Sequence, residues 1–444
     1  MLYLYSEYSI LSNKKKSMDT PLAYIPRIAD NMLQEQLAAA GVVLVQGPKW
    51  CGKTTTAEQQ AKSVLYLDAP KTRQANLLLA ETDPEILFQG ETPRLIDEWQ
   101  LAPKLWDAAR FEVSRRRLPG QLIFTGSSVP PDMSELTHSG TGRFAWLTMR
   151  PMSLQESGES NGNISLEALF QGEVAAAIAT DISLHELAFL ICRGGWPGSL
   201  SLTSKAALRQ AINYVEAVAN SDISRVDGIS RSPEFTRRLL SSYARHQGQQ
   251  VPISTIYKDL ENNKNGSMSE ETIGSYIHAL KKIFVIEDMP AWNPNLRSKT
   301  SIRTSDTRYF VDPSIAAAAL GLGPEDLIGD LNTFGLLFET MAIRDLRIYA
   351  YALDGQVYHY RDKNGLECDA VLHLRNGSFG LIEVKLGGDS LIEAGANTLK
   401  QLADKIDTMK MRPPSFLMVL TGVGQYAYRR KDGVYVVPIG CLKD

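Results

Sequence analysis

A phosphate-binding loop is the clearest chemical signal in the sequence. A short apolar run, Val42 to Val45, leads into Gly47-Pro48-Lys49-Trp50-Cys51-Gly52-Lys53-Thr54, which fits the pattern G-x-x-x-x-G-K-[ST]. The glycines let the backbone turn so that several N–H groups face one anion, and the next helix points its positive end at the same anion. In such a loop the lysine reaches the β- and γ-phosphates, and the Thr54 hydroxyl ligates Mg²⁺. These residues, together with Thr55, predict a site for ATP and Mg²⁺.

A second apolar run, residues 94–98, ends in two carboxylates. We predict that Asp97 holds the metal opposite the loop and that Glu98 is the general base that polarises the attacking water. An acidic cap at the end of a strand is the simpler alternative for this segment taken alone. Its position, with Asp97 44 residues after Lys53, favours the catalytic interpretation.

Small polar residues end a third predicted strand, residues 121–128. Thr125 and Ser127 are candidates to sense the γ-phosphate or to orient the water, and an ordinary turn is the alternative. Arg143 follows the Gly-rich segment 138–143 and could act as an arginine finger, in cis or toward a neighbouring subunit. A structural or solvated arginine is the alternative there. For Arg27, just before the first predicted helix, a surface role is favoured, and contact with nucleotide or a neighbour is the alternative.

Composition limits the class of protein. A chain of 444 residues with 44% hydrophobic and 22% charged residues is typical of a globular protein of two or three domains. The net charge of −3 argues against binding polyanions over the whole surface, but allows a local basic patch. Four scattered cysteines without C-x-x-C spacing predict reduced thiols in a cytoplasmic chain and no structural zinc. No apolar run reaches the roughly 18 residues of a membrane span.

The order of predicted elements divides the chain. Residues 1–22 are expected to be a disordered extension. Strands and helices alternate through residues 23–160, which predicts a parallel sheet covered on both faces. Residues 161–225 have helical spacing without a strand run and are predicted to form a lid or linker, with Trp196 packed in the core.

The next segment, residues 226–312, has the order of a winged helix. Predicted helices at 233–246, 253–260 and 269–283 precede strand-like runs at 284–289 and 308–311. The hairpin carries four basic residues against only Asp306, and these could contact a phosphate backbone: Arg297, Lys299, Arg303 and Arg308. Glu270 and Glu271 would repel DNA from the third helix, so docking to a protein is the alternative.

The last segment, residues 325–444, carries a second chemical constellation. A predicted helix at 332–349 holds Glu339 on an apolar face, and the strands that follow bring Asp369, Glu383 and Lys385. Carboxylates that bind Mg²⁺ and a lysine that stabilises charge are what metal-assisted phosphodiester hydrolysis requires. An ordinary strand with an exposed salt bridge is the alternative, and is favoured for Glu383 and Lys385 alone.

Taken together, these motifs resemble the bacterial and archaeal ATPases of the AAA+ superfamily that carry a C-terminal domain with a restriction-endonuclease-like, PD-(D/E)xK, fold. The resemblance extends from Tyr24 onward and includes Gly194-Gly-Trp-Pro197. It implies an α/β P-loop NTPase domain, then a helical and winged-helix part, then an α/β nuclease-like domain, with ATP binding and slow hydrolysis. Trp50 is bulkier than the residue expected at this position of the loop, and no proline precedes Asp369.

The favoured hypothesis is an ATPase coupled to a nuclease-like module, with DNA as a candidate partner and no membrane. One alternative is an ATP-gated nuclease that acts through Glu339, Asp369, Glu383 and Lys385. Another is a non-catalytic, nucleotide-switched module that docks DNA or protein. AAA+ domains often assemble, so a homo-oligomer or a protein partner is a further expectation, although nothing in the sequence sets the number of subunits.

Overall fold

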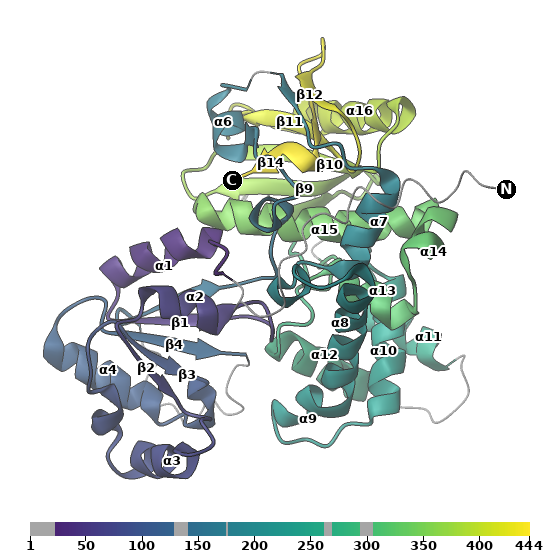
Figure 1. Cartoon of the computed structure of the whole chain (residues 1–444). Coiled ribbons are helices and arrows are strands. Elements are labelled where there is room, and N and C mark those ends of the chain that lie inside the picture. The colour runs from purple at the N-terminus through teal and green to yellow at the C-terminus, as the bar shows by residue number, and fades with distance from the viewer. Residues whose placement is uncertain (1–22, 128–140, 175, 262–268, 294–304) are drawn as a thin grey trace.

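The computed structural model describes residues 23–127, 141–174, 176–261, 269–293 and 305–444. The predicted extension, 1–22, and the predicted wing residues Arg297, Lys299 and Arg303 lie outside these ranges. Figure 1 shows three parts: an N-terminal sheet with its helices, a group of helices beside it, and a C-terminal sheet above both.

The N-terminal part is built on five parallel strands in the order β2-β3-β4-β1-β5. The strands are β1 (Val42–Gln46), β2 (Ser63–Tyr66), β3 (Arg94–Asp97), β4 (Leu122–Gly126) and β5 (Phe144–Thr148). The apolar runs of the three central strands, β3, β4 and β1, are buried as expected for a parallel sheet, whereas the edge strands β2 and β5 are partly exposed. Because parallel strands end at the same edge, the ends of β1, β3 and β4 lie side by side, with Asp97 opposite Thr125 and Gln46 opposite Gly126.

Helices cover both faces of this sheet (Figure 1). Helices α1 (Ile28–Ala39) and α2 (Lys53–Gln60) share one apolar cluster with the sheet, and α3 (Arg73–Thr82) and α4 (Leu105–Arg116) share another. Two short 3₁₀ turns, Pro84–Phe88 and Trp99–Leu101, connect the elements on the second face. The predicted two-faced α/β domain is therefore the fold observed.

A group of mostly short helices follows. The helices are α5 (Leu154–Ser157), α6 (Leu166–Gln171), α7 (Leu184–Arg193), α8 (Ser204–Ala217), α9 (Ile223–Arg225), α10 (Pro233–Arg245), α11 (Ile253–Glu261), α12 (Glu270–Lys282), α13 (Pro313–Leu320) and α14 (Pro324–Gly329). Most of them enclose one core, in which Trp196 is buried and packs on Tyr214, as predicted for this turn. The predicted hairpin after α12 differs from a regular ladder: within the described residues its two runs meet at two isolated antiparallel bridges, Ile286–Phe310 and Met289–Thr307.

The C-terminal part begins with the long helix α15 (Leu331–Ala352). A mixed sheet lies against it in the order β7-β12-β13-β11-β10-β9-β8. The strands are β8 (Gly355–Arg361), β9 (Glu367–Leu374), β10 (Phe379–Lys385), β11 (Phe416–Thr421), β12 (Tyr426–Arg429) and β13 (Tyr435–Pro438). Helix α16 (Asp389–Lys405) covers the opposite face, with its own apolar cluster.

Part of the range predicted as a helical lid lies on this C-terminal sheet instead. Strand β7 (Ala177–Ile178) pairs with β12, and β6 (Ile164–Ser165) pairs with β14 (Leu442–Lys443). A strand of two residues is too short to show an alternating pattern of apolar and polar residues, and its partner strand lies far along the chain. The local sequence therefore does not predict these strands. The structure therefore joins residues 164–178 to the C-terminal part.

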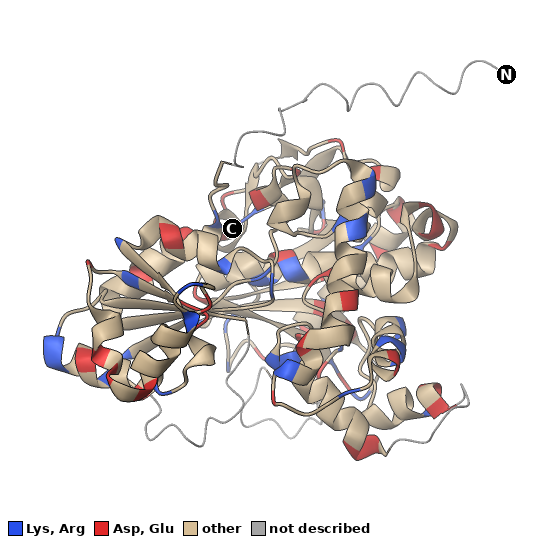
Figure 2. Ribbon diagram, turned by 60° about the horizontal axis from the view of Figure 1, so that its bottom comes forward, with Lys and Arg blue, Asp and Glu red and all other residues tan. Residues whose placement is uncertain are grey.

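Charge is distributed without a single dominant sign. Figure 2 shows basic and acidic residues interspersed over the helices of all three parts. Within the described ranges, no helix is both long enough and apolar enough to cross a membrane.

Candidate functional site

Two glycines shape the phosphate loop between β1 and α2. Gly47 has φ +150°, and a Cβ there would lie 2.1 Å from the carbonyl oxygen of Met149. Gly52 has φ +100° and directly precedes α2. Both backbone conformations favour glycine, so the loop can close against the end of β5 only with glycine at these two positions.

Lys53 and Thr54 stand at the start of α2 as predicted for such a loop. The buried Lys53 amine donates a hydrogen bond of 2.8 Å to the Pro48 carbonyl, inside the loop. The Thr54 hydroxyl donates to Asp97 Oδ1 at 2.8 Å, and the Thr125 hydroxyl donates to the same oxygen. The structure thus brings together groups from the ends of β1, β3 and β4. A hydroxyl and a carboxylate are hard oxygen donors, so Thr54 and Asp97 fit a magnesium ion.

Glu98 follows β3 in a left-handed backbone conformation, with φ 57°. Burial, and then the charge of Asp97, raise the pKa of its carboxyl, while Lys53 and Lys49 act in the opposite direction. The Gln100 side-chain amide donates to Glu98 and orients it. A carboxylate whose pKa is raised is a stronger base, which suits proton abstraction near neutral pH.

A cavity of about 460 Å³ lies between this edge of the sheet and the helical part. Lys49, Glu98 and Ser127 line it from the first domain. Its wall in the helical part is made by Tyr214, Val218, Asp222, Arg225, Val226 and Ile283. Two of the predicted catalytic residues, Glu98 and Ser127, therefore face a partly open cavity whose other wall comes from the helical part.

Two contacts cross from the loop to the helical part. The Lys49 amine lies 2.6 Å from Asp222 Oδ1, and the Trp50 ring lies 5.6 Å from the Tyr214 ring in an edge-to-face arrangement. Asp222 ends a π-helical turn, Val218–Asp222, a geometry frequently found at functional sites. Sequence reasoning did not single out Asp222 or Tyr214, because no motif surrounds them and only tertiary packing brings them to the loop.

The remaining predicted loop residues take different positions. Cys51 is buried, with its thiol directed at the Met149 carbonyl, so only its backbone serves the loop. Thr55 is exposed on the first turn of α2. Trp50 is 46% exposed and has φ 66°, a strained conformation for a bulky residue.

The structure corrects two sequence-based placements. Arg143 directly precedes β5, at the amino-terminal edge of the parallel sheet, and donates to Ser114. The phosphate loop follows the carboxyl end of β1, so Arg143 cannot serve this loop in cis. Arg27, which we had placed on the surface, is buried and hydrogen-bonds the loop backbone at Cys51.

A second polar group, which we call the carboxylate–lysine cluster, consists of Glu339, Asp369, Glu383 and Lys385. The Lys385 amine lies 2.7 Å from Glu383 and 3.1 Å from Asp369, which also accepts the backbone N–H of Val384 at 2.7 Å. Burial and the charge of Asp369 raise the pKa of Glu339 and of Glu383 to about 8. The Tyr309 hydroxyl, from the segment before α13, donates to Glu339.

In this arrangement Lys385 occupies the carboxylates that would otherwise be open to a divalent cation. Among the residues that the structure describes, no group of three or more His, Cys, Asp and Glu side chains is placed to hold a metal ion. Lys385 pairs with both strand carboxylates, and Glu383 Oε1 is buried with no hydrogen-bond partner among the described residues. The four predicted residues therefore lie near one another in the fold, with Lys385, Asp369 and Glu383 ion-paired and Glu339 hydrogen-bonded by Tyr309.

Of the four basic residues in the predicted wing, the structure describes only Arg308, and its contacts differ from those expected of a DNA-binding residue. Arg308 is largely buried, pairs with Asp288 at 2.7 Å and donates to the Val251 carbonyl. An arginine with these partners stabilises the helical part and is not free for a phosphate backbone.

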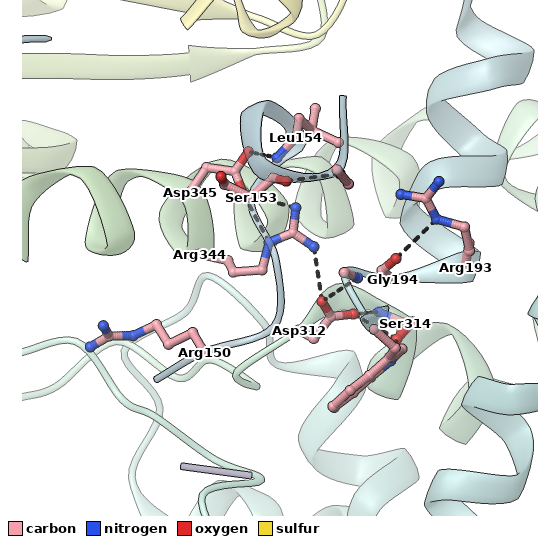
Figure 3. Close-up of polar contacts among 12 residues, drawn as sticks. Arg150, Ser153, Leu154, Arg193, Gly194, Asp312, Ser314, Arg344 and Asp345 are labelled. Carbon is pink, nitrogen blue, oxygen red and sulfur yellow. Dashed lines mark hydrogen bonds and ion pairs between the residues drawn. The ribbon is translucent and has the colours of Figure 1, made fainter. Parts of the chain in front are cut away.

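A buried charge network joins the helical part to the C-terminal part near α5 (Figure 3). Arg344 of α15 pairs at 2.8 Å with Asp312 and with Asp345. Asp312 accepts the backbone N–H of Gly195, and Asp345 accepts that of Leu154, each at 3.0 Å. Since each charge has a partner of opposite sign, the network ties α15 to α5 and to the glycine-rich turn.

Three regions of the chain match known protein families. Residues 39–158 match the family described as an AAA domain. Residues 184–326 match a domain of unknown function, DUF8612, and residues 334–442 match another, DUF4143. With the loop geometry above, the match to an AAA domain supports a P-loop nucleotide-binding fold for the first part of the chain.

Relatives of similar length are distant. Uncharacterized proteins of Mycobacterium tuberculosis and Mycobacterium bovis are each 24% identical over 365 residues, which cover 81% of this chain and 73% of theirs. The Walker-type ATPase of Pyrococcus abyssi is similar at 15% identity and a TM-score of 0.41, over 67% of this chain and 96% of that one. The Orc1 protein of Aeropyrum pernix in complex with DNA shows 11% identity and a TM-score of 0.20, over 70% and 95% of the two chains.

Proposed function

We propose that the chain binds Mg–ATP in the phosphate loop and hydrolyses it to ADP and phosphate. One observation carries this proposal: Lys53, Thr54, Asp97 and Glu98 converge at the carboxyl edge of the parallel sheet, beside a partly open cavity that Glu98 lines. Open α/β sheets bind ligands at this edge.

Each group has a distinct role in this proposal. Lys53 would leave the Pro48 carbonyl and bind the β- and γ-phosphates. Thr54 and Asp97 would hold Mg²⁺, which neutralises charge on the phosphates. Glu98 would take a proton from the attacking water, and Thr125 and Ser127 would position that water or the γ-phosphate.

Hydrolysis would be coupled to the helical part through the loop contacts. Lys49 pairs with Asp222 across the cavity, and a bound polyphosphate would compete with Asp222 for the lysine. A neighbouring subunit could still receive Arg143 as a finger in trans, since the residue is exposed at the far edge of the domain.

The test is release of phosphate from ATP by the full chain, with and without Mg²⁺ and with and without duplex DNA. Turnover that requires Mg²⁺ supports the proposal, and a rise with DNA would support DNA as the partner. Absence of both ATP binding and turnover would refute it.

The carboxylate–lysine cluster supports a second candidate, an ATP-gated nuclease. Asp369, Glu383 and Lys385 adjoin on β9 and β10, and Glu339 lies beside them. Cleavage would require Lys385 to release the carboxylates and Tyr309 to leave Glu339. Cleavage of DNA or RNA with Mg²⁺ or Mn²⁺ that is lost in Asp369→Ala would support this candidate. Retained DNA or protein binding without cleavage would favour a non-catalytic, nucleotide-switched module.

A further inference from the structure

Arg27 occupies the space behind the phosphate loop. It precedes α1, and only 6% of the residue is exposed. Its guanidinium bonds three segments: Nη1 donates to the Cys51 carbonyl at 2.8 Å, Nη2 donates to the Arg150 carbonyl at 2.9 Å, and Nε donates to Glu156 at 3.0 Å. The side chain therefore ties the loop to the segment after β5 and to α5.

The bond to the Cys51 carbonyl matters because of peptide geometry. A trans peptide is planar, so its C=O and N–H point in opposite directions. Arg27 holds the Cys51 carbonyl on the outer side of the loop, and the N–H of Gly52, in the same peptide, is thereby directed inward. Inward N–H groups are what a phosphate loop offers to its anion.

Glu156 keeps the guanidinium in place. The carboxylate accepts from Arg27, from the backbone N–H groups of Ile28 and Ser153 at 2.9 Å each, and from the Ser153 hydroxyl. The side chains of Arg27 and Glu156 are 4% and 2% exposed. A planar guanidinium held by a buried carboxylate has little freedom to rotate, so its third contact, the loop carbonyl, is also fixed.

We propose that Arg27 is a positioning residue for nucleotide binding, which holds the Cys51–Gly52 peptide in the orientation that binds phosphate. This inference rests on the proposed function. The charge of Arg27 is balanced by Glu156, so the residue acts through the loop backbone and does not bind the nucleotide. Since loop N–H groups cradle the α- and β-phosphates, ADP and ATP should depend on Arg27 equally.

The experiment measures ATP and ADP affinity by titration calorimetry for the full chain, Arg27→Ala and Arg27→Lys. We expect Arg27→Ala to weaken both nucleotides about tenfold or more, by the same factor. Free guanidinium ion at millimolar concentration should restore part of the affinity of Arg27→Ala. Arg27→Lys keeps the charge but cannot bond all three segments, so it should weaken both nucleotides at least about threefold, and it serves as the test if Arg27→Ala does not fold.

Arg193→Ala is the matched control. Arg193 is also buried, pairs with Glu159 at 2.5 Å and donates to a backbone carbonyl, that of Gly194, but it does not touch the loop. Its loss should lower thermal stability without changing nucleotide affinity.

Three results would count against the inference. Affinities of both Arg27 variants within about twofold of the wild type would overturn it, since a fold-change that small is below the cost of a lost hydrogen bond. Weakened ATP with unchanged ADP would also overturn it, because Arg27 would then act on the γ-phosphate directly. No nucleotide binding by the wild type would refute the proposed function, and the inference with it.

Discussion

The phosphate loop and the carboxylate–lysine cluster each centre on a lysine, but the two lysines have opposite surroundings. The Lys53 amine donates to a neutral carbonyl, and in the part of the chain that the structure describes no carboxylate pairs with it. The Lys385 amine lies within 3.1 Å of two carboxylates. Lys53 therefore keeps its charge available for an added anion, whereas the charge of Lys385 is already neutralised within the protein.

The difference shows that a motif locates chemical groups without deciding whether they are ready to act. Both regions carry the residue types that phosphate chemistry requires. The first presents them to a cavity of about 460 Å³, and the second pairs them with one another and with Tyr309. Lys53 has only a neutral partner to exchange for a phosphate, and the Lys49–Asp222 pair at the loop is partly exposed. Chemistry at the cluster needs buried ion pairs to break, which is costly.

The largest expected effect is that of Glu98→Gln on turnover. Removing the general base should lower ATP turnover about 100-fold or more while ATP binding stays close to that of the wild type. Because the base must be ionised, wild-type turnover should also fall as the pH is lowered through the raised pKa of Glu98. The measurement is steady-state phosphate release over a pH series that starts below the ordinary pKa of a glutamate and ends above neutrality.

Glu91→Gln, at an exposed carboxylate in the same domain, is the control and should leave turnover unchanged. Equal turnover by Glu98→Gln and the wild type would show that Glu98 is not the base. The contrast between the phosphate loop and the carboxylate–lysine cluster would then rest on nucleotide binding alone.

The second effect concerns the ion pairs that join the two regions. Glu287 lies 2.6 Å from Arg150 and 3.7 Å from Arg347 of α15. Burial raises the pKa of Glu287, but the charges of these arginines outweigh burial and lower the pKa from 4.5 to about 2. A depressed pKa stabilises the folded state above the unfolded value, and this contribution is lost as the pH falls from about 4.5 to about 2.

Glu287→Gln should therefore lower the free energy of unfolding by about 2 to 3 kcal/mol at neutral pH and by progressively less below pH 4.5. Urea unfolding of both proteins across this pH range is the measurement. A difference that does not depend on pH would mean that the charge of Glu287 does not hold the regions together.

The third effect tests whether Tyr309 caps the cluster. Tyr309→Phe removes the hydroxyl that donates to Glu339, so we expect the free energy of unfolding to fall by about 1 kcal/mol. The bond also lowers the pKa of Glu339, which should rise further in the variant. Chemical denaturation at neutral pH measures the first change, and unaltered ATP affinity is the internal control. Unchanged stability would show that the cluster is not held closed by this contact.

The fold was more predictable than the contacts that complete its sites. The strand at 94–97 and the loop from Gly47 to Thr54 were predicted from local runs of apolar residues and glycines, and the structure places them as expected. Parallel pairing then brings Asp97 beside Thr125. The match of residues 39–158 to an AAA domain agrees with the prediction because the phosphate-binding residues lie in one contiguous motif, Gly47 to Thr54.

Contacts between distant segments could not be predicted. Asp222 reaches Lys49, and Arg27 reaches Cys51 and Glu156, only through packing of whole domains. The pairing of Lys385 with both carboxylates depends on the register of β9 and β10, which a single sequence does not specify. Whether the cluster is open or closed is therefore a tertiary property.

The smallest expected effect is that of Asp222→Asn. The Lys49–Asp222 pair holds the loop lysine away from an incoming phosphate, and a partly exposed ion pair contributes little. The substitution should free Lys49 and tighten ATP binding about two- to fivefold. Fluorescence titration of both proteins with an ATP analogue measures this change in affinity. Weaker binding would instead identify Asp222 as a group that contacts the nucleotide.

The central claim is that the charge of Lys53 is available to a nucleotide. Equilibrium binding of Mg–ATP to the full chain, beside Lys53→Ala, tests it most directly, with Lys104→Ala as the exposed-lysine control. We predict saturable binding to the wild type and to the control, and at least about 100-fold weaker binding to Lys53→Ala. Equal affinity of Lys53→Ala and the wild type would contradict the account.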